Sequence, residues 1–216
     1  MLAIRRGSSL VTAILVTTFA AAGCGKDGDG FGPPGNQPPP NIPTFPVVST
    51  FDANHEQWRI VGDAQDGRGV PFYDAQGGNP GGRIYAVDDV LGRAWFFRAP
   101  ARFLGNAAAA YGKVLRFDLM TSDTAQAAPK PDAVMLVGTH KTLVINDPPT
   151  PGLSWTRYSF RLDETGGWIV RETGAPATKA DFDQALANLT DLYIRGEFRP
   201  ELDIGWLDNV YFGADN

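Results

Sequence analysis

Short apolar segments separated by Gly, Pro and Asp recur from Val47 onward, roughly every ten residues, a spacing typical of all-β sandwiches and barrels. In Lys113–Met120, Leu115 and Phe117 point to one face and Arg116 to the other, the period of a half-buried strand. The segments predicted to be strands are Val47–Phe51, Trp58–Val61, Arg83–Val87, Ala94–Arg98, Lys113–Met120, Ala133–Val137, Thr142–Ile145, Trp155–Leu162, Leu192–Arg195 and Trp206–Phe212. This pattern predicts an all-β fold, a β-sandwich of the jelly-roll type.

One short helix is predicted in the second half of the chain. Thr178–Asp181 resembles a capping box, with Asp in place of the usual Glu. Phe182, Leu186 and Leu189 then recur at helical spacing, so the helix should pack one face on the sandwich.

A long glycine-rich loop is predicted from Gly62 to Gly82, and it contains Phe72 and Tyr73. Ordered loops of this length are uncommon and often functional. The loop lacks the Lys-Ser/Thr ending of a P-loop and no helix follows it, which disfavours phosphate binding.

Residues 1–23 have the pattern of a signal peptide, with a basic start and an apolar stretch, Leu10–Ala22, that is too short for a comfortable membrane span. Ala21–Cys24 resembles the lipobox of bacterial lipoproteins, in which the cysteine is acylated and becomes the first mature residue. Cys24 is the only cysteine and would have no disulfide partner, which favours lipidation. Ordinary cleavage after Ala22 is the alternative.

Residues 24–46 are rich in Gly and Pro and poor in apolar side chains, so we expect a disordered tether between the anchor and a folded domain. A disordered leader without a role is the alternative. By resemblance to Gram-negative sorting rules, Gly25 after the cysteine favours export to the outer membrane or cell surface. The predicted division is therefore signal peptide 1–23, tether 24–46 and folded domain 47–213.

Charge narrows the class of partner. The full chain has a formal net charge of −5, and loss of Arg5 and Arg6 with the signal peptide would leave −7. An acidic chain without basic runs is not expected to bind nucleic acid. Since no second apolar stretch is long enough to span a bilayer, membrane contact is expected only through the lipid anchor.

A series of motifs follows in a characteristic order along the folded part. They are Asn79–Gly82, Ala94–Pro100, Phe103–Asn106, Tyr111–Phe117, Pro131–Leu136, Trp155–Tyr158, Asp181–Phe182, Leu186–Arg195 and Leu207–Val210. Together they resemble the laminin B domain (laminin IV type A) over about Val47 to Gly213. The resemblance implies a galactose-binding-like jelly roll, an architecture shared with many carbohydrate-binding modules. Since flanking EGF-like cysteines do not occur, we expect a bacterial, single-domain lipoprotein relative.

The sequence contains no recognisable set of catalytic residues. His55 and His140 occur in predicted turns, and no G-x-S-x-G or H-E-x-x-H motif is present. Paired acids such as Asp88-Asp89 point to opposite faces of a strand, which does not suit glycoside hydrolysis. The chain is therefore predicted not to be an enzyme.

The resemblance also implies one structural calcium ion. In jelly-roll carbohydrate-binding modules such an ion often joins the first strand to the last, held by an acid after an opening Phe and an Asp in the closing strand. Asp52 and Asp208 match those two positions, and Asp88 could complete the set of oxygen ligands. Hydrogen bonding of Asp52 and Asp208 to turn amides is the alternative.

Exposed aromatic rings would provide platforms for sugar rings. The candidates are Phe72 and Tyr73 in the long loop and Trp168 beside two glycines, with simple packing as the alternative for each. The tryptophans assigned to the core are those in strand patterns, Trp58, Trp95, Trp155 and Trp206.

The leading hypothesis is a non-enzymatic, lipid-anchored binding module for a glycan or an envelope or matrix component. A structural protein that binds an envelope partner through a sheet face is the second hypothesis, and a glycan-acting hydrolase is the third. Exposed loop aromatics would favour the first, a contiguous apolar sheet face the second, and a cleft with two carboxylates the third.

Overall fold

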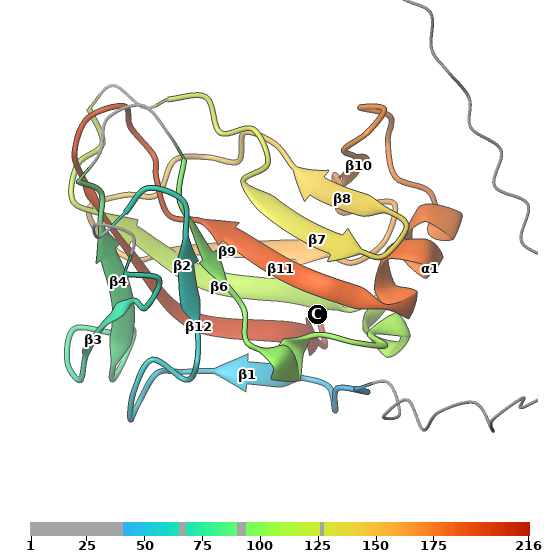
Figure 1. The fold of residues 1–216 in the computed structure, drawn as a ribbon, viewed down its shortest axis with the longest axis horizontal. Helices are drawn as coiled ribbons and strands as arrows, with labels where there is room; N and C mark the ends of the chain where they lie inside the picture. Colours follow the sequence, from blue (N-terminus) through green and yellow to red (C-terminus); the bar gives the residue numbers. More distant parts are fainter. Residues whose placement is uncertain (1–40, 65–67, 90–93, 126–127) are drawn as a thin grey trace, which may run out of the picture. The chain divides into compact units, whose positions relative to one another are not determined.

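A computed structural model describes residues 41–64, 68–89, 94–125 and 128–216, and in it two antiparallel sheets form a sandwich (Figure 1). Sheet A has the order β3-β4-β12-β6-β9, with β1 also paired to β12. Its strands are β1 (Val47–Ser49), β3 (Phe72–Asp74), β4 (Arg83–Val87), β6 (Val114–Thr121), β9 (Thr156–Arg161) and β12 (Ile204–Ala214). This arrangement confirms the predicted jelly-roll sandwich.

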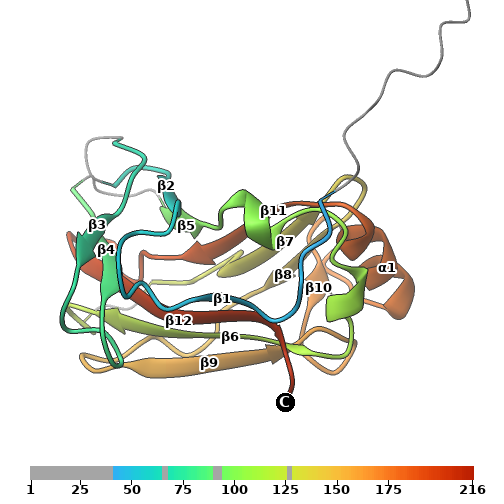
Figure 2. The same cartoon turned by 90° about the horizontal axis from the view of Figure 1, so that it is seen from below.

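Sheet B has the order β10-β8-β7-β11-β5-β2 and forms the second layer, as Figure 2 shows. Its strands are β2 (Arg59–Val61), β5 (Phe96–Arg98), β7 (Val134–Gly138), β8 (Thr142–Ile145), β10 (Ile169–Val170) and β11 (Leu189–Arg195). Two short 3-10 turns follow β5, at Ala101–Phe103 and Ala108–Ala110.

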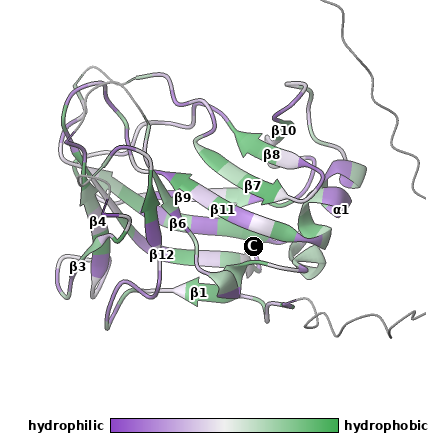
Figure 3. Cartoon of the chain, viewed as in Figure 1, coloured by the Kyte–Doolittle hydropathy of each residue, from purple (hydrophilic) through white to green (hydrophobic). Residues whose placement is uncertain are grey.

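The core lies between the sheets and is rich in aromatic side chains. Trp58 stacks edge-on against Phe103 with centroids 5.4 Å apart, and Trp95 against Phe97 at 5.0 Å. Hydrophobic and hydrophilic residues alternate along the strands, as Figure 3 shows for β6 and β12. Burying one large hydrophobic side chain stabilises the fold by roughly 1.5–3 kcal/mol. The alternation therefore decides which face of each strand turns toward the core.

Each strand predicted from the sequence is present, with ends within about three residues. The strands that sequence reasoning missed are β3, inside the glycine-rich loop, and β10, which has two residues. The helix α1 (Lys179–Ala187) begins at Thr178, whose Oγ1 accepts a hydrogen bond from the Asp181 backbone N–H. The Asp181 carboxylate accepts one from the Thr178 N–H in return, so the predicted capping box is confirmed.

The packed part of the chain includes residues 41–46, which the sequence assigned to the tether. The Phe45 ring packs edge-on against Phe212, with centroids 5.4 Å apart, and the Asn41 carbonyl accepts a hydrogen bond from the Asn106 N–H. Residues 1–40, which contain Cys24 and most of the predicted tether, lie outside the described residues. Among the described residues, no helix is long and apolar enough to cross a membrane.

Candidate functional site

The outward face of sheet A carries half-exposed aromatic and charged side chains. Along β12, Leu207 and Val210 are fully buried and point into the core. Trp206 and Tyr211 are half-buried, and they lie on the opposite face. Trp206 and Tyr211 are separated by an odd number of positions, which in a regular strand would place them on opposite faces. A register shift between Asp208 and Tyr211 keeps both of them on the outward face.

Four residues from neighbouring strands form a row across this face. Phe72 on β3 pairs with Tyr85 on β4, Tyr85 pairs with Trp206 on β12, and Trp206 pairs with Met120 on β6. The Phe72 and Tyr85 rings stack with centroids 5.2 Å apart, and the Tyr85 and Trp206 centroids are 6.4 Å apart. All four side chains are partly exposed, so the row is a platform that solvent can reach. We call it the aromatic row.

Cationic side chains lie over the aromatic row. The Arg83 guanidinium carbon is 5.3 Å from the Trp206 ring centroid, and that of Arg68 is 5.6 Å from the Phe72 centroid. Arg83 Nη2 also donates to Asp74 Oδ2 at 3.0 Å. A backbone hydrogen bond from Gln76 and the Arg83 guanidinium lower the pKa of Asp74, which stays ionised. The row is therefore bordered by fixed donors and acceptors.

A buried pair of acids lies on the same face. Asp118 and Asp208 are direct partners on β6 and β12, and neither is exposed. Arg157 donates to both Asp118 oxygens, Nε to Oδ1 at 2.8 Å and Nη2 to Oδ2 at 3.0 Å. The side-chain amides of Asn79 and Asn209 each donate to Asp118 Oδ2 at 3.0 Å.

The turn at the end of the glycine-rich loop covers this acid pair. The Asn79 backbone N–H donates to Asp208 Oδ2 at 2.5 Å, and Trp155 Nε1 donates to the Gly77 carbonyl at 3.3 Å. Gly81 has φ +91°, and a Cβ there would lie 2.5 Å from Asp52 Oδ1, so glycine is required. The loop thus docks on sheet A, and the covered acids are out of a substrate's reach.

Burial, with a smaller effect of the charges of Asp118 and Asp52, raises the pKa of Asp208 to about 6 against the lowering effect of the Asn79 and Asn209 backbone N–H groups. The Asp208 carboxylate accepts hydrogen bonds from the backbone N–H groups of Asn79 and Asn209. Such bonding to turn amides was the alternative to a role as calcium ligand. Asp52 Oδ2 accepts a hydrogen bond from Thr50 Oγ1 at 2.7 Å.

The three predicted metal ligands do not come together. Asp52 lies near Asp208, whereas Asp88 lies beside Asp203, whose carbonyl accepts a hydrogen bond from the Asp88 N–H at 2.9 Å. Asp203 and Asp208 are five residues apart on one extended segment, which separates them by about 16 Å. One ion cannot contact both Asp88 and Asp208, because a calcium–oxygen bond is only about 2.4 Å long.

Of the predicted ligand-binding aromatics, Phe72 belongs to the aromatic row, while Tyr73 turns to the other side of β3 and donates its hydroxyl to the Asp52 carbonyl at 3.0 Å. The assignment of Trp168 to a ligand site is wrong. Its ring is 2% exposed, packs between Phe160 and Phe182, and donates Nε1–H to the Arg161 carbonyl at 2.7 Å.

Among the tryptophans assigned to the core, Trp58 and Trp95 are fully buried, as predicted, but Trp155 and Trp206 are half-exposed. Tyr85 and Trp206 were therefore the functional candidates that sequence reasoning missed. The alternation Trp206–Leu207 and Ile84–Tyr85, with one buried member in each pair, was the signal that could have placed them outward.

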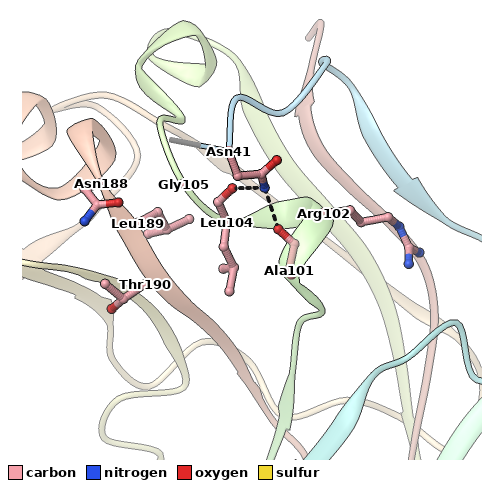
Figure 4. A pocket seen from close by; sticks show the side chains of 8 residues that line it. All are labelled: Asn41, Ala101, Arg102, Leu104, Gly105, Asn188, Leu189 and Thr190. Carbon is pink, nitrogen blue, oxygen red and sulfur yellow. Dashed lines mark hydrogen bonds between the residues drawn. The ribbon is translucent and has the colours of Figure 1, made fainter. Parts of the chain in front are cut away.

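The structure also has a depression of about 380 Å³ next to the 3-10 turn after β5 (Figure 4). Asn41 lies on its rim and donates from Nδ2 to the carbonyls of Ala101 (2.7 Å) and Leu104 (2.6 Å). The charged side chain in its lining is Arg102, which is already bonded to Glu56 and Ser49. Asn188 Nδ2 and Thr190 Oγ1 in its lining also donate within the chain, to Thr139 Oγ1 and to the Val137 carbonyl, so we assign the depression no ligand.

Comparisons with known proteins agree with this fold. The family model of Laminin B (Domain IV) matches residues 96–214. Laminin subunit gamma-1 of Danio rerio is 31% identical over 170 residues, which are 76% of this chain and 10% of that protein. The chain thus spans about a tenth of the length of this curated relative.

A solved laminin domain gives the same assignment of fold. The L4b domain of human laminin alpha-2 has a TM-score of 0.56 and 14% identity, covering 79% of this chain and 98% of that domain. A family 11 carbohydrate-binding module from Clostridium thermocellum, in complex with a mixed-linked tetrasaccharide, has a TM-score of 0.49 and 12% identity, covering 79% of this chain and 95% of the module.

Proposed function

Because this chain belongs to the Laminin B (Domain IV) family, we propose that its folded domain is a non-enzymatic binding module whose sheet A face takes a carbohydrate. The aromatic row of Phe72, Tyr85, Trp206 and Met120 carries the proposal. Sugar rings present C–H faces that pack on exposed aromatic rings, and their hydroxyls need charged or polar partners alongside.

The arrangement of this face suits a glycan better than an apolar protein surface. Arg83 and Arg68 lie against the aromatic row, and Asp74 is held beside Arg83 by their ion pair. Arg116 lies over the Tyr211 ring, 4.6 Å from its centroid, farther along β6 and β12. Since arginine side chains lie over the aromatic rings of this face, it is not the wholly apolar patch that a docking protein would bury.

The same face argues against hydrolysis. A glycosidase needs two carboxylates that reach the scissile bond. On this face the closest acid pair, Asp118 and Asp208, is fully buried beneath the turn at Asn79 and bonded to Arg157 and backbone amides. The pair stabilises the loop that borders the aromatic row, and we assign it no catalytic role.

The remaining parts of the proposal concern location. We propose that the chain is a bacterial protein that is exported, cleaved before Cys24 and acylated there, so that the domain is displayed from the outer membrane or cell surface. Cys24 and the Gly/Pro-rich residues after it support this proposal. The partner would then be a glycan or another envelope or matrix component within reach of the tether.

A glycan-array screen of the full-length protein tests the proposed function. Binding should be lost in Tyr85→Ala and in Trp206→Ala, because each removes a ring from the row. Tyr193→Ala is the matched control, since Tyr193 is a half-buried aromatic residue on sheet B and packs against Phe96. Equal loss in the control, or binding that survives both row variants, would contradict the proposal. A blank array with folded protein would favour the protein-partner hypothesis.

A further inference from the structure

A second depression in the surface lies at the edge of sheet B that β2 and β5 form (Figure 2). It has a volume of about 360 Å³ and adjoins the depression of Figure 4, with which it shares Ala101 and Leu104. Its lining consists of apolar side chains from the segment after β5 and of three polar ones, Gln57, Arg59 and Arg98. We call it the arginine depression.

Arg59 and Arg98 lie side by side because they are direct partners on the antiparallel strands β2 and β5. Ile60 and Phe97, the next pair along these strands, are buried in the core, so both exposed arginines point outward. Direct partners on one face have Cβ atoms about 5 Å apart, and like charges at this spacing repel each other. The arginine pair therefore lowers the stability of the domain unless an anion accompanies it.

One of these two positive charges has no counter-ion in the described part of the chain. Arg98 donates from Nε to Asp191 Oδ1 at 2.5 Å, which leaves both of its Nη groups without a hydrogen-bond partner among the described residues. Over the same residues, Arg59 forms neither an ion pair nor a side-chain hydrogen bond. Two guanidinium groups and one carboxylate leave one uncompensated positive charge, which matches a ligand with a single anionic group.

Gln57 belongs to this lining in a backbone conformation that few residues adopt. Its φ is +65° and that of Glu56 is +47°, both in the left-handed region where residues other than glycine are uncommon. Arg102 bonds to the Glu56 carboxylate and donates from Nη1 to the Glu56 carbonyl at 2.9 Å. The Glu56 carboxylate also accepts a hydrogen bond from the Phe51 N–H at 2.7 Å. These bonds fix the backbone that presents the exposed Gln57 amide beside the two arginines.

We propose that the arginine depression binds an acidic sugar residue, whose carboxylate or sulfate group lies between Arg59 and Arg98. A guanidinium forms paired, charge-assisted hydrogen bonds to such oxyanions. The apolar side chains between Ala99 and Leu104 suit the C–H face of a sugar ring. The Gln57 amide can donate to the hydroxyls of the ring or accept from them.

The charge of the protein favours a sugar over an acidic peptide or a nucleic acid. The chain has a formal net charge of −5, so a ligand with several closely spaced negative charges meets overall repulsion. An acidic sugar carries one charge on a ring, and the single uncompensated arginine balances that charge. A neutral sugar would leave the arginine pair without its counter-ion.

This site is separate from the aromatic row. The row lies on the outward face of sheet A, whereas Arg59 and Arg98 lie on the outward face of sheet B. The inference therefore stands without the proposed function. Tyr85→Ala and Trp206→Ala should leave binding at the arginine depression unchanged.

The test is an NMR titration of the full-length protein with trigalacturonate, with its uncharged methyl ester and with galactose 6-sulfate. The Nε–H signals of Arg59 and Arg98, assigned with Arg59→Lys and Arg98→Lys, should shift with a Kd on the order of 1 mM, because exposed ion pairs are weak. The methyl ester should leave both signals in place. Shifts with the uronate, with the sulfate or with both support the proposal and identify the oxyanion that the site accepts.

Variants locate the ligand. Arg59→Gln and Arg98→Gln should each weaken the binding of the acidic sugar at least about tenfold, because each removes charged hydrogen bonds. Arg59→Gln should also leave the Tm equal or higher, since it relieves the repulsion with Arg98, whereas loss of a merely structural arginine would lower the Tm. Arg171→Gln is the matched control. Arg171 is 54% exposed and pairs with Asp132 as Arg98 pairs with Asp191, and its loss should leave binding unchanged.

The proposal is overturned if neither arginine signal moves at about 10 mM trigalacturonate or galactose 6-sulfate, roughly ten times the expected Kd. It is also overturned if the methyl ester shifts the signals equally, if Arg59→Gln binds as tightly as the wild type, or if Arg171→Gln weakens binding as much. A tripeptide of aspartate that binds more tightly than trigalacturonate would overturn it in favour of an acidic protein partner.

Discussion

Replacing Asp118 by Asn should destabilise the domain through its polar network while leaving its shape unchanged. The Asp118 carboxylate is fully buried and accepts four hydrogen bonds, three of them at Oδ2. An amide retains one acceptor oxygen, which can take the Oδ2 position, but it carries no charge and turns an NH₂ group toward Arg157 Nε. The bond at Oδ1 is then lost, and the three bonds at Oδ2 become weaker neutral ones.

The magnitude follows from how well water can replace each lost or weakened hydrogen bond of these donors. Arg157 has 57% of its side chain exposed, and Asn79 is exposed, so both can be rehydrated at low cost. Asn209 is 8% exposed, but its Nδ2 keeps the Asn79 carbonyl as an acceptor at 2.6 Å. Given about 1.5–3 kcal/mol for a hydrogen bond to a charged group, discounted for exposure, we expect a loss of about 2–3 kcal/mol.

Thermal unfolding at pH 7 measures this loss, which corresponds to a fall in Tm of about 4–12 °C for a domain of this size. Asp183→Asn, which removes only an exposed pair on α1, should change the free energy of unfolding by less than about 0.5 kcal/mol. The pKa of Asp208 should also fall in Asp118→Asn, because the charge of Asp118 helps to raise it. An unchanged Tm, together with an unchanged Asp208 pKa, would refute the reasoning.

Three further predictions concern separate parts of the chain. The hydrogen bonds of Thr178 and then the Lys141 ammonium lower the pKa of Asp181 to about 2, so its contribution to stability is fully present above about pH 4 and is lost as the pH falls through 2. Asp181→Ala should therefore lower the Tm much more at pH 7 than at pH 2. Trp168→Ala should cost about 3–5 kcal/mol in denaturant unfolding, since a buried ring leaves a cavity, and a loss below 1 kcal/mol would contradict its place in the core. In a host that processes lipoproteins, labelled palmitate should enter the wild type but not Cys24→Ala, and equal labelling would exclude the anchor.

The sequence predicted the strands well because hydrophobic alternation is a local property. It missed β3 and β10 because each has two or three residues and is held by its partner strand rather than by its own pattern. The start of the helix at Thr178 could be predicted because both partners of a capping box lie within four residues of each other.

Side-chain environments were harder to predict where the chain bends. Trp168 follows two glycines and was taken for a loop residue, yet the turn folds it back onto Phe160 and Phe182. Trp206 was assigned to the core because it lies in a strand pattern, and the register shift after Asp208 obscures which face of β12 it is on.

The aromatic row could not be found from sequence, because its members come from four strands that are adjacent in sheet A but not in the chain. The long-range register of these strands, and not a local pattern, brings the four side chains together.

The most direct test of carbohydrate binding on sheet A is the NMR signal of the Trp206 indole N–H during titration with a glycan that the array identifies. The chain has five tryptophans, of which Trp58, Trp95 and Trp168 are buried. We predict that the Trp206 signal, assigned with Trp206→Phe, shifts in proportion to bound ligand while the three buried signals stay in place. A bound glycan that leaves the Trp206 signal unmoved would contradict the account.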